Sequence, residues 1–151
     1  MYKVQEVANW FLNEVPGITN KKLQKLVYYA YAWHLVLSNE SVNALESKLF
    51  DNNFEAWVHG AVYPELYYEY KKYGSGVIPG FDGNLANFSD DEVDILHQVV
   101  EVYGAYTGNQ LESICHKESP WMEARGKLAP NEPSNEAIKD DAIFNCYSAR
   151  L

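Results

Sequence analysis

The sequence is poor in the residues that build disulfides and metal sites. Its two cysteines, Cys115 and Cys146, form no Cys-x-x-Cys pair. This count excludes a disulfide framework and a cysteine-rich zinc site, and both thiols are expected to be reduced and mostly buried. The four histidines show none of the spacings that hold zinc on a helix. We therefore expect neither a metal nor a cofactor.

Long apolar runs and catalytic motifs are also missing. No stretch of about 18 apolar residues is present, so no membrane-spanning helix is expected. The N-terminus, residues 1–6, has no apolar signal-peptide core, which favours a cytoplasmic protein. There is neither a Gly-x-Ser-x-Gly elbow nor a phosphate-binding loop. The sequence therefore predicts no catalytic residues. A hydrolase that uses His34, His59 or His116 with a carboxylate remains an alternative.

Positive charge is scarce. Twelve Lys and Arg stand against 21 Asp and Glu, which gives a net charge of −9. Residues 76–151 hold five basic and 13 acidic residues, so most of the excess lies there. Nucleic-acid binding depends on basic surfaces that neutralise phosphates, and this composition argues against it. An acidic half is compatible with a basic protein partner or simply with solubility.

Aromatic residues are plentiful, with 12 Tyr, four Trp and six Phe. Many lie in two tracts, residues 28–33 and 63–70. Because successive helical residues point about 100° apart, we expect some of these rings to be partly exposed. Tyr and Trp are enriched at protein interfaces. The tracts therefore indicate either a core built with aromatic rings or a partner-binding face.

Length and periodicity predict one mainly α-helical domain over residues 1–151, with six or seven helices and at most a short β-hairpin. Helix caps are expected at Thr19, Ser89, Thr107, Ser119 and Ser134. The expected helices are 2–14, 19–38, 64–73, 89–104, a segment from 107, a short segment from 119, and 134–150. Residues 38–53 and 74–84 are expected to be loops, the second with a short strand at 77–78 as an option, and residues 54–59 a strand.

Three segments resemble motifs of the Panacea domain, the SocA-like antitoxin domain. Residues 18–30 resemble its Lys-Leu-Gln-Lys-Leu helix with an aromatic pair. Residues 54–67 resemble its Glu-Ala-Trp and Gly-Pro-Val segment, although Ala61 stands where the family usually has proline. Residues 111–121 resemble its Leu, His, Pro-Trp signature. The resemblance covers about residues 3–125, with the motifs in the same order.

The resemblance implies an antitoxin that neutralises a cognate toxin by direct protein contact. The toxin would typically be encoded by a neighbouring gene, often in a prophage. The resemblance also implies two alternatives, a proteolytic adaptor that delivers a toxin to a ClpXP-type AAA+ protease and a phage-associated accessory protein. Because the resemblance covers nearly the whole chain, no separate DNA-binding arm is expected, and the scarcity of basic residues argues against a nucleic-acid partner.

The motif residues fall into two groups. The expected partner-binding residues are polar or aromatic: Lys22, Lys25, Tyr28, Tyr29, Glu55, Tyr63 and Tyr67. The motif residues expected to be scaffold are Gln24, His34, Trp57, His59, Gly60, Pro64, His116, Pro120 and Trp121.

Overall fold

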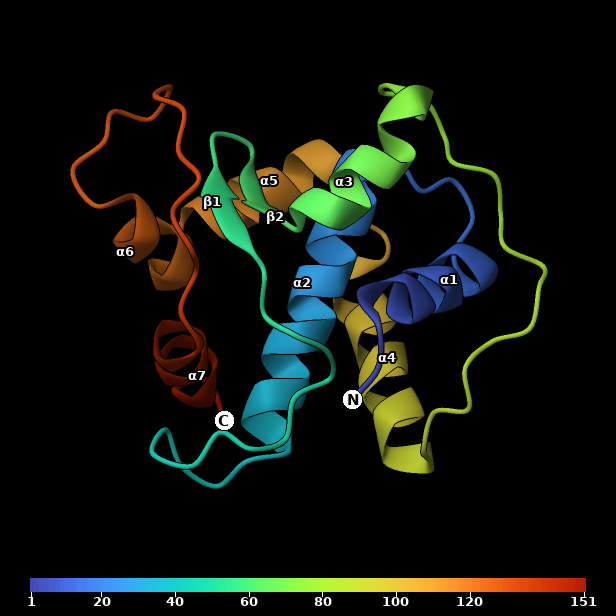
Figure 1. Cartoon of the computed structure of the whole chain (residues 1–151), viewed down its shortest axis with the longest axis horizontal. Coiled ribbons are helices and arrows are strands. Elements are labelled where there is room, and N and C mark those ends of the chain that lie inside the picture. Colours follow the sequence, from blue (N-terminus) through green and yellow to red (C-terminus); the bar gives the residue numbers. More distant parts are fainter.

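Helix α2 (Asn20–Leu37) runs through the middle of the molecule, and the other helices pack around it (Figure 1). The computed structural model describes all 151 residues. Fifteen of the 18 residues of α2 are buried, and the helix contacts α1, α3, α4, α5 and α7 as well as strand β2. A helix that is buried on nearly every side belongs to the core, which accounts for its few charged residues beyond the first turns.

Seven α-helices and one antiparallel hairpin make up the fold, which confirms the predicted fold class. The remaining elements are α1 (Val4–Glu14), β1 (Glu55–Trp57), β2 (Gly60–Val62), α3 (Pro64–Tyr70) with a 3-10 turn (Lys71–Tyr73), α4 (Asp90–Tyr103), α5 (Gly108–His116), α6 (Ser119–Arg125) and α7 (Asp140–Ser148). None of these helices has both the length and the hydrophobicity that crossing a membrane requires.

Side-chain caps set the start of three helices. The hydroxyls of Thr19, Ser89 and Thr107 each accept a hydrogen bond from the backbone N–H three residues on. These hydrogen bonds confirm three of the predicted caps. Each cap satisfies a backbone N–H that has no partner within the helix. Ser119 is the first residue of α6 rather than its cap, since the preceding residue, Glu118, occupies the cap position.

The predicted C-terminal helix begins later than its sequence suggests. We expected a helix from Ser134, but α7 starts at Asp140. Residues 134–139 instead run beside β1, where the backbone N–H of Ala56 donates to Glu136 O at 2.9 Å and that of Ile138 donates to Phe54 O at 3.0 Å. These bonds satisfy the free edge of β1, so the backbone of 134–139 is extended and not helical.

The chain turns at Val58 and His59, within residues 54–59 that were predicted to form a single strand, and β2 begins at Gly60. β1 and β2 pair antiparallel, with Trp57 opposite Gly60 and Ala56 opposite Ala61. Gly60 has a φ of 102°, a conformation that favours glycine. Ala61 is fully buried in β2. The hairpin therefore forms with alanine at the position where the resemblance suggests proline.

Candidate functional site

Three aromatic side chains form a cluster on the surface where the hairpin meets α3. The Trp57 and Tyr67 ring centroids lie 5.1 Å apart, those of Tyr67 and Tyr68 5.5 Å, and those of Trp57 and Tyr68 6.2 Å. Tyr68 is 61% exposed, and the other two rings are half-buried. We call Trp57, Tyr67 and Tyr68 the surface aromatic cluster.

Local structure fixes the orientation of this cluster. Pro64 lies in the first turn of α3, where its missing N–H costs nothing. Tyr67 and Tyr68 are therefore carried on a short helix that starts at a fixed point. Trp57 lies on β1, and its indole N–H donates to Glu55 Oε1 at 2.9 Å. The Glu55 carboxylate therefore holds the indole at the outer side of the hairpin.

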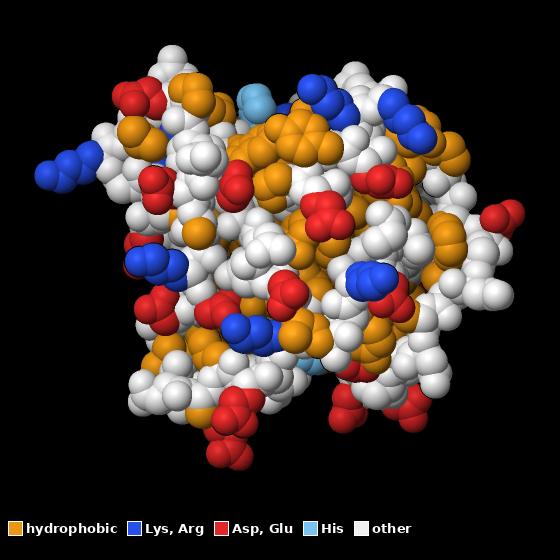
Figure 2. All heavy atoms as spheres, viewed as in Figure 1, with side chains coloured by type: hydrophobic (Ala, Val, Ile, Leu, Met, Phe, Trp, Pro, Cys, Tyr) orange, Lys and Arg blue, Asp and Glu red, His pale blue; other side chains and the backbone are white.

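Two hollows flank the cluster. One, of about 630 Å³, is bordered by Trp57 and Tyr67 together with the first turns of α2 and α5; we call it the basic cleft, because three lysines and His59 line it. The other, of about 830 Å³, is bordered by Trp57 and Tyr68 and by residues 133–135. Figure 2 shows hydrophobic side chains, lysines and a histidine along the upper edge, over the hairpin and α3, and acidic side chains at the lower edge.

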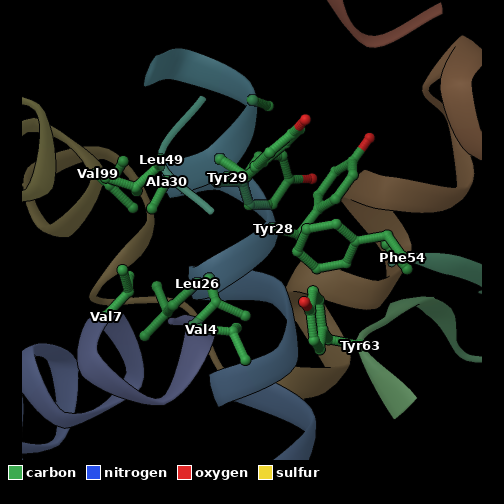
Figure 3. Packing of buried hydrophobic residues seen from close by; sticks show 14 of the residues in the cluster. Val4, Val7, Leu26, Tyr28, Tyr29, Ala30, Leu49, Phe54, Tyr63 and Val99 are labelled. Atoms are coloured by element: carbon green, nitrogen blue, oxygen red, sulfur yellow. The ribbon is translucent and has the colours of Figure 1, made fainter. Parts of the chain in front are cut away.

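Tyr28 and Tyr29 are fully buried, so the prediction that they are partly exposed is wrong. Tyr28 packs edge-to-face on Phe54 with centroids 5.3 Å apart, and Tyr29 stacks on Tyr103 at 3.9 Å. In Figure 3 the rings of Tyr28, Phe54 and Tyr63 pack together from three different segments. The rings point in different directions from α2, and each packs against a different neighbouring element. This part of α2 therefore has no solvent-exposed face.

Tyr63 is buried as well, contrary to the expectation of a partner-binding surface. It is 4% exposed, and its hydroxyl donates to Asp51 O at 3.1 Å and accepts from Asn53 Nδ2 at 3.2 Å. Both bonds join Tyr63 to the segment before β1. Of the expected partner-binding residues, Glu55 and Tyr67 are the two that keep a substantial accessible surface.

The two expected partner-binding lysines are also buried. Lys22 donates from its ammonium to Gly104 O, at the C-terminal end of α4, at 2.6 Å. A cation at this negative end of the helix dipole stabilises the contact between α2 and α4. Lys25 is 1% exposed, and burial lowers the pKa of its ammonium to about 8. Its side chain lines the basic cleft.

The expected scaffold residues of α2 make contacts inside the protein. The Gln24 amide accepts from the backbone N–H of Tyr63 at 2.9 Å and donates to Asn20 Oδ1 at 3.0 Å. It therefore joins α2 to the segment between β2 and α3. His34 Nε2 lies 3.2 Å from Ser47 Oγ, and burial lowers the pKa of this imidazole.

The expected scaffold residues of the third motif hold the hairpin. His116 Nε2 hydrogen-bonds Val58 O at 2.8 Å, and its ring stacks on Trp121 at 4.2 Å. Trp121 donates from its indole N–H to Trp57 O at 2.8 Å. Pro120, in the first turn of α6, is buried. These contacts fasten α5 and α6 to β1 and to the turn that follows it.

Glu118 is a buried cross-link between segments that are distant in the sequence. The buried Glu118 carboxylate accepts from the hydroxyls of Tyr29 at 2.7 Å and Tyr147 at 2.9 Å, and it pairs with the Arg150 guanidinium at 2.6 Å. These partners lie far from Glu118 in the sequence, and no local pattern identifies them.

The histidines do not converge on one chemical site. His34 and His116 make the separate contacts described above. His59, which is exposed, pairs through Nδ1 with Glu112 Oε1 at 3.1 Å, and Lys21 Nζ lies 2.8 Å from the same oxygen. No group of three or more His, Cys, Asp or Glu side chains is arranged to hold a metal ion. The accessible side chains around the hairpin, α3 and the first turns of α2 and α5 include three clustered aromatic rings and several basic groups.

Comparison with known families agrees with the motifs. The model described as "Antitoxin SocA-like, Panacea domain" matches residues 23–122, which include most of α2, the hairpin, α3, α4, α5 and the Pro120–Trp121 turn. Neither a search of curated proteins nor one of solved structures returned a match. Because the matched region spans well over half of the 151 residues, this chain belongs to the SocA-like Panacea domain family of antitoxins.

Proposed function

We propose that the protein is the antitoxin of a toxin–antitoxin pair and neutralises its toxin by direct contact in the cytoplasm. The match to the antitoxin family over residues 23–122 carries this proposal. The role needs a binding surface and no catalysis. It fits a protein whose four histidines are scattered and in which three accessible aromatic rings, including the most exposed tyrosine, are gathered at one place.

The surface aromatic cluster is the contact surface that we assign to the toxin. Tyr and Trp are over-represented among the residues that dominate binding energy, because they bury large areas with few rotatable bonds. Tyr68 is the most exposed tyrosine, and Tyr67 and Trp57 lie directly against it. Glu55 hydrogen-bonds Trp57 at the edge of this surface, so it would orient the indole for the partner.

The acidic remainder of the protein suits a basic toxin. The net charge is −9, and the acids are concentrated in residues 76–151. Long-range attraction of this kind raises the rate of association more than it raises affinity. The association rate should therefore fall as salt is added, while the contribution of the aromatic rings should change little.

The test is co-expression with the product of the neighbouring gene, scored by growth and by pull-down. The wild type should rescue growth and retain the toxin. Tyr67→Ala and Tyr68→Ala should each weaken binding by about 2 kcal/mol if they are dominant contacts. Tyr106→Ala, which removes another exposed tyrosine outside the cluster, is the matched control and should rescue fully.

Three results would redirect the proposal. If both variants bind and rescue as the wild type does, the surface aromatic cluster is not the interface. If rescue requires a ClpXP-type protease and the toxin level falls, the protein acts as a proteolytic adaptor. If the wild type neither binds nor neutralises the neighbour, the antitoxin role with that partner is wrong, and an accessory role in a phage becomes the better account.

A further inference from the structure

The basic cleft has a volume that suits a small molecule, and toxin binding at the surface aromatic cluster does not require such a cleft. Its volume of about 630 Å³ lies in the range of small-molecule sites, which is roughly 300–1,000 Å³. The first turns of α2 and α5 form one side, and β1, β2, α3 and the 3-10 turn border the other. It therefore has the size of a ligand site and is lined by four separate segments.

Lys25 lines this cleft without a partner. The side chain is 1% exposed, yet no hydrogen bond or ion pair joins its ammonium to another residue. Buried ammonium groups are ordinarily paired, because desolvating an isolated charge is costly. Gly60 makes room for the side chain: a Cβ at that position would lie 2.8 Å from Lys25 Cε. The fold thus holds an unpaired ammonium at the wall of a cleft.

Two helix N-termini meet at the same place. Asn20 begins α2 and Gly108 begins α5, and both residues line the cleft. The first turns touch, since a Cβ at Gly108 would lie 3.1 Å from Lys21 Cβ. The capping threonines satisfy only the third N–H of each helix. The earlier N–H groups have no partner within their helices, and such groups bind anions.

The remaining charges leave the cleft positive. No Asp or Glu lines it. Glu112, on α5 beside it, lies 2.8 Å from Lys21 Nζ and 3.1 Å from His59 Nδ1 and so compensates these two groups. Lys25 and Lys71 form no ion pair with an acid, although Glu112 attracts the Lys25 charge at longer range and the Lys71 ammonium lies 5.7 Å from the centre of the Tyr68 ring. An acidic protein therefore keeps two cations without a directly paired acid at one hollow.

We propose that the basic cleft binds a small phosphorylated ligand with a planar ring, of the size of a nucleotide. The phosphates would lie between Lys25, Lys71 and the N-termini of α2 and α5, because lysine and helix N-termini both bind phosphate. The planar part would lie against Trp57 and Tyr67, whose rings border the same cleft. This site goes beyond the proposed antitoxin function and shares two of its aromatic rings, so the ligand and the toxin would affect each other's binding.

The test is calorimetric titration of the purified chain with pyrophosphate, ADP, GDP and adenosine at constant ionic strength. The nucleoside diphosphates should bind, adenosine should bind at least tenfold more weakly, and added salt should weaken the phosphate-dependent part. Lys25→Met should reduce affinity for ADP or GDP by about tenfold or more, the effect of losing one charged hydrogen bond. Lys127→Ala removes an exposed lysine that does not line the cleft and should leave binding unchanged.

Lys71→Ala provides a second variant at an exposed position, where loss of the side chain does not threaten folding. It should weaken the binding of diphosphates more than that of adenosine. The proposal is overturned if the wild type binds none of the phosphates, if both cleft variants bind as the wild type does, or if adenosine binds as tightly as ADP. Binding of a hexaglutamate peptide with no binding of diphosphates would overturn it in favour of an acidic protein segment.

Discussion

At the scale of single residues, Glu118 connects more of the fold than any other side chain of the third motif. One carboxylate joins α2 through Tyr29, α7 through Tyr147, and the C-terminal end through Arg150. Burial and the nearby carboxylate raise the pKa of Tyr29 far above that of a free tyrosine, so its hydroxyl stays a donor at every physiological pH. The network therefore depends on the Glu118 carboxylate as the acceptor that its partners share.

Removing this carboxylate should destabilise the protein strongly. Glu118→Ala leaves the Arg150 guanidinium and two buried hydroxyls without their acceptor, and we expect a loss of about 3 kcal/mol in the free energy of unfolding. Urea unfolding followed by circular dichroism measures it. Glu123→Ala removes an exposed acid of α6 and serves as the control. Equal stability of the two variants would show that the network contributes little.

Gly60 should resist substitution for two separable reasons. Gly60→Ala puts a side chain at a φ of 102° and brings its Cβ to 2.8 Å from Lys25 Cε. Gly126→Ala imposes only the first strain, because its φ is 60° and nothing lies within 4 Å of the added Cβ. We expect a cost of about 1 kcal/mol for Gly126→Ala and about 2–3 kcal/mol for Gly60→Ala in urea unfolding. If both cost the same, Lys25 moves away without penalty.

At the scale of elements, α6 and the C-terminal segment hold the hairpin in place. Trp121 donates to Trp57 O at 2.8 Å, and Arg125 donates to Ala56 O at 3.3 Å. On the edge of β1 that faces away from β2, residues 136–138 supply backbone hydrogen bonds. A two-stranded hairpin is at best marginally stable by itself. The position of the surface aromatic cluster therefore depends on α6.

Trp121→Ala should test this dependence. Trp121 is 8% exposed and stacks on His116, so truncation should cost about 3–5 kcal/mol through lost packing and an unpaired Trp57 carbonyl. Met122→Ala, at a neighbouring residue that is 45% exposed, is the control and should cost little. Thermal unfolding gives the comparison. A Trp121→Ala protein that melts like the wild type yet loses its partner would instead make Trp121 an interface residue.

Most elements could be predicted because their signals are local. A capping hydroxyl followed by an apolar period of 3.6 identified the starts of the helices at Thr19, Ser89 and Thr107. The start of α7 could not be found in this way, because the competing bonds of residues 134–139 are made to β1, far away in the sequence. Predictions failed where a distant strand edge satisfied the backbone better than a local cap.

The candidate site was predicted less well than the fold. The aromatic tract of residues 28–33 has the composition of an interface, but α2 is surrounded by other elements and its tyrosines lie in the core. The accessible rings come instead from α3 and β1. Exposure depends on which elements cover a helix, and that information lies in residues distant along the sequence. The basic cleft was missed for the same reason, since four separate segments form it.

At the scale of the whole molecule, buried ionisable groups should give stability a specific pH dependence. Burial lowers the pKa of Lys25 from 10.5 to about 8, although Cys115 and Glu112 act to raise it and Lys21 to lower it further. Between about pH 8 and 10.5 the unfolded chain keeps this proton while the folded protein loses it. Stability from Lys25 therefore rises with pH across this window, and below about pH 8 the buried charge imposes its full cost.

The difference between wild type and Lys25→Met isolates this effect. Burial raises the pKa values of the core tyrosines Tyr28 and Tyr147, which lowers stability at high pH, but both proteins share that loss. From pH 8 to 10 the wild type should gain about 2 kcal/mol relative to the variant, since each pH unit is worth at most about 1.4 kcal/mol. Urea unfolding at pH 7, 8, 9 and 10 measures the difference, with Lys127→Met as the control for an exposed lysine. Parallel curves for wild type and Lys25→Met would mean that the Lys25 ammonium is fully hydrated in the folded protein, and the case for an unpaired charge in the basic cleft would fail with it.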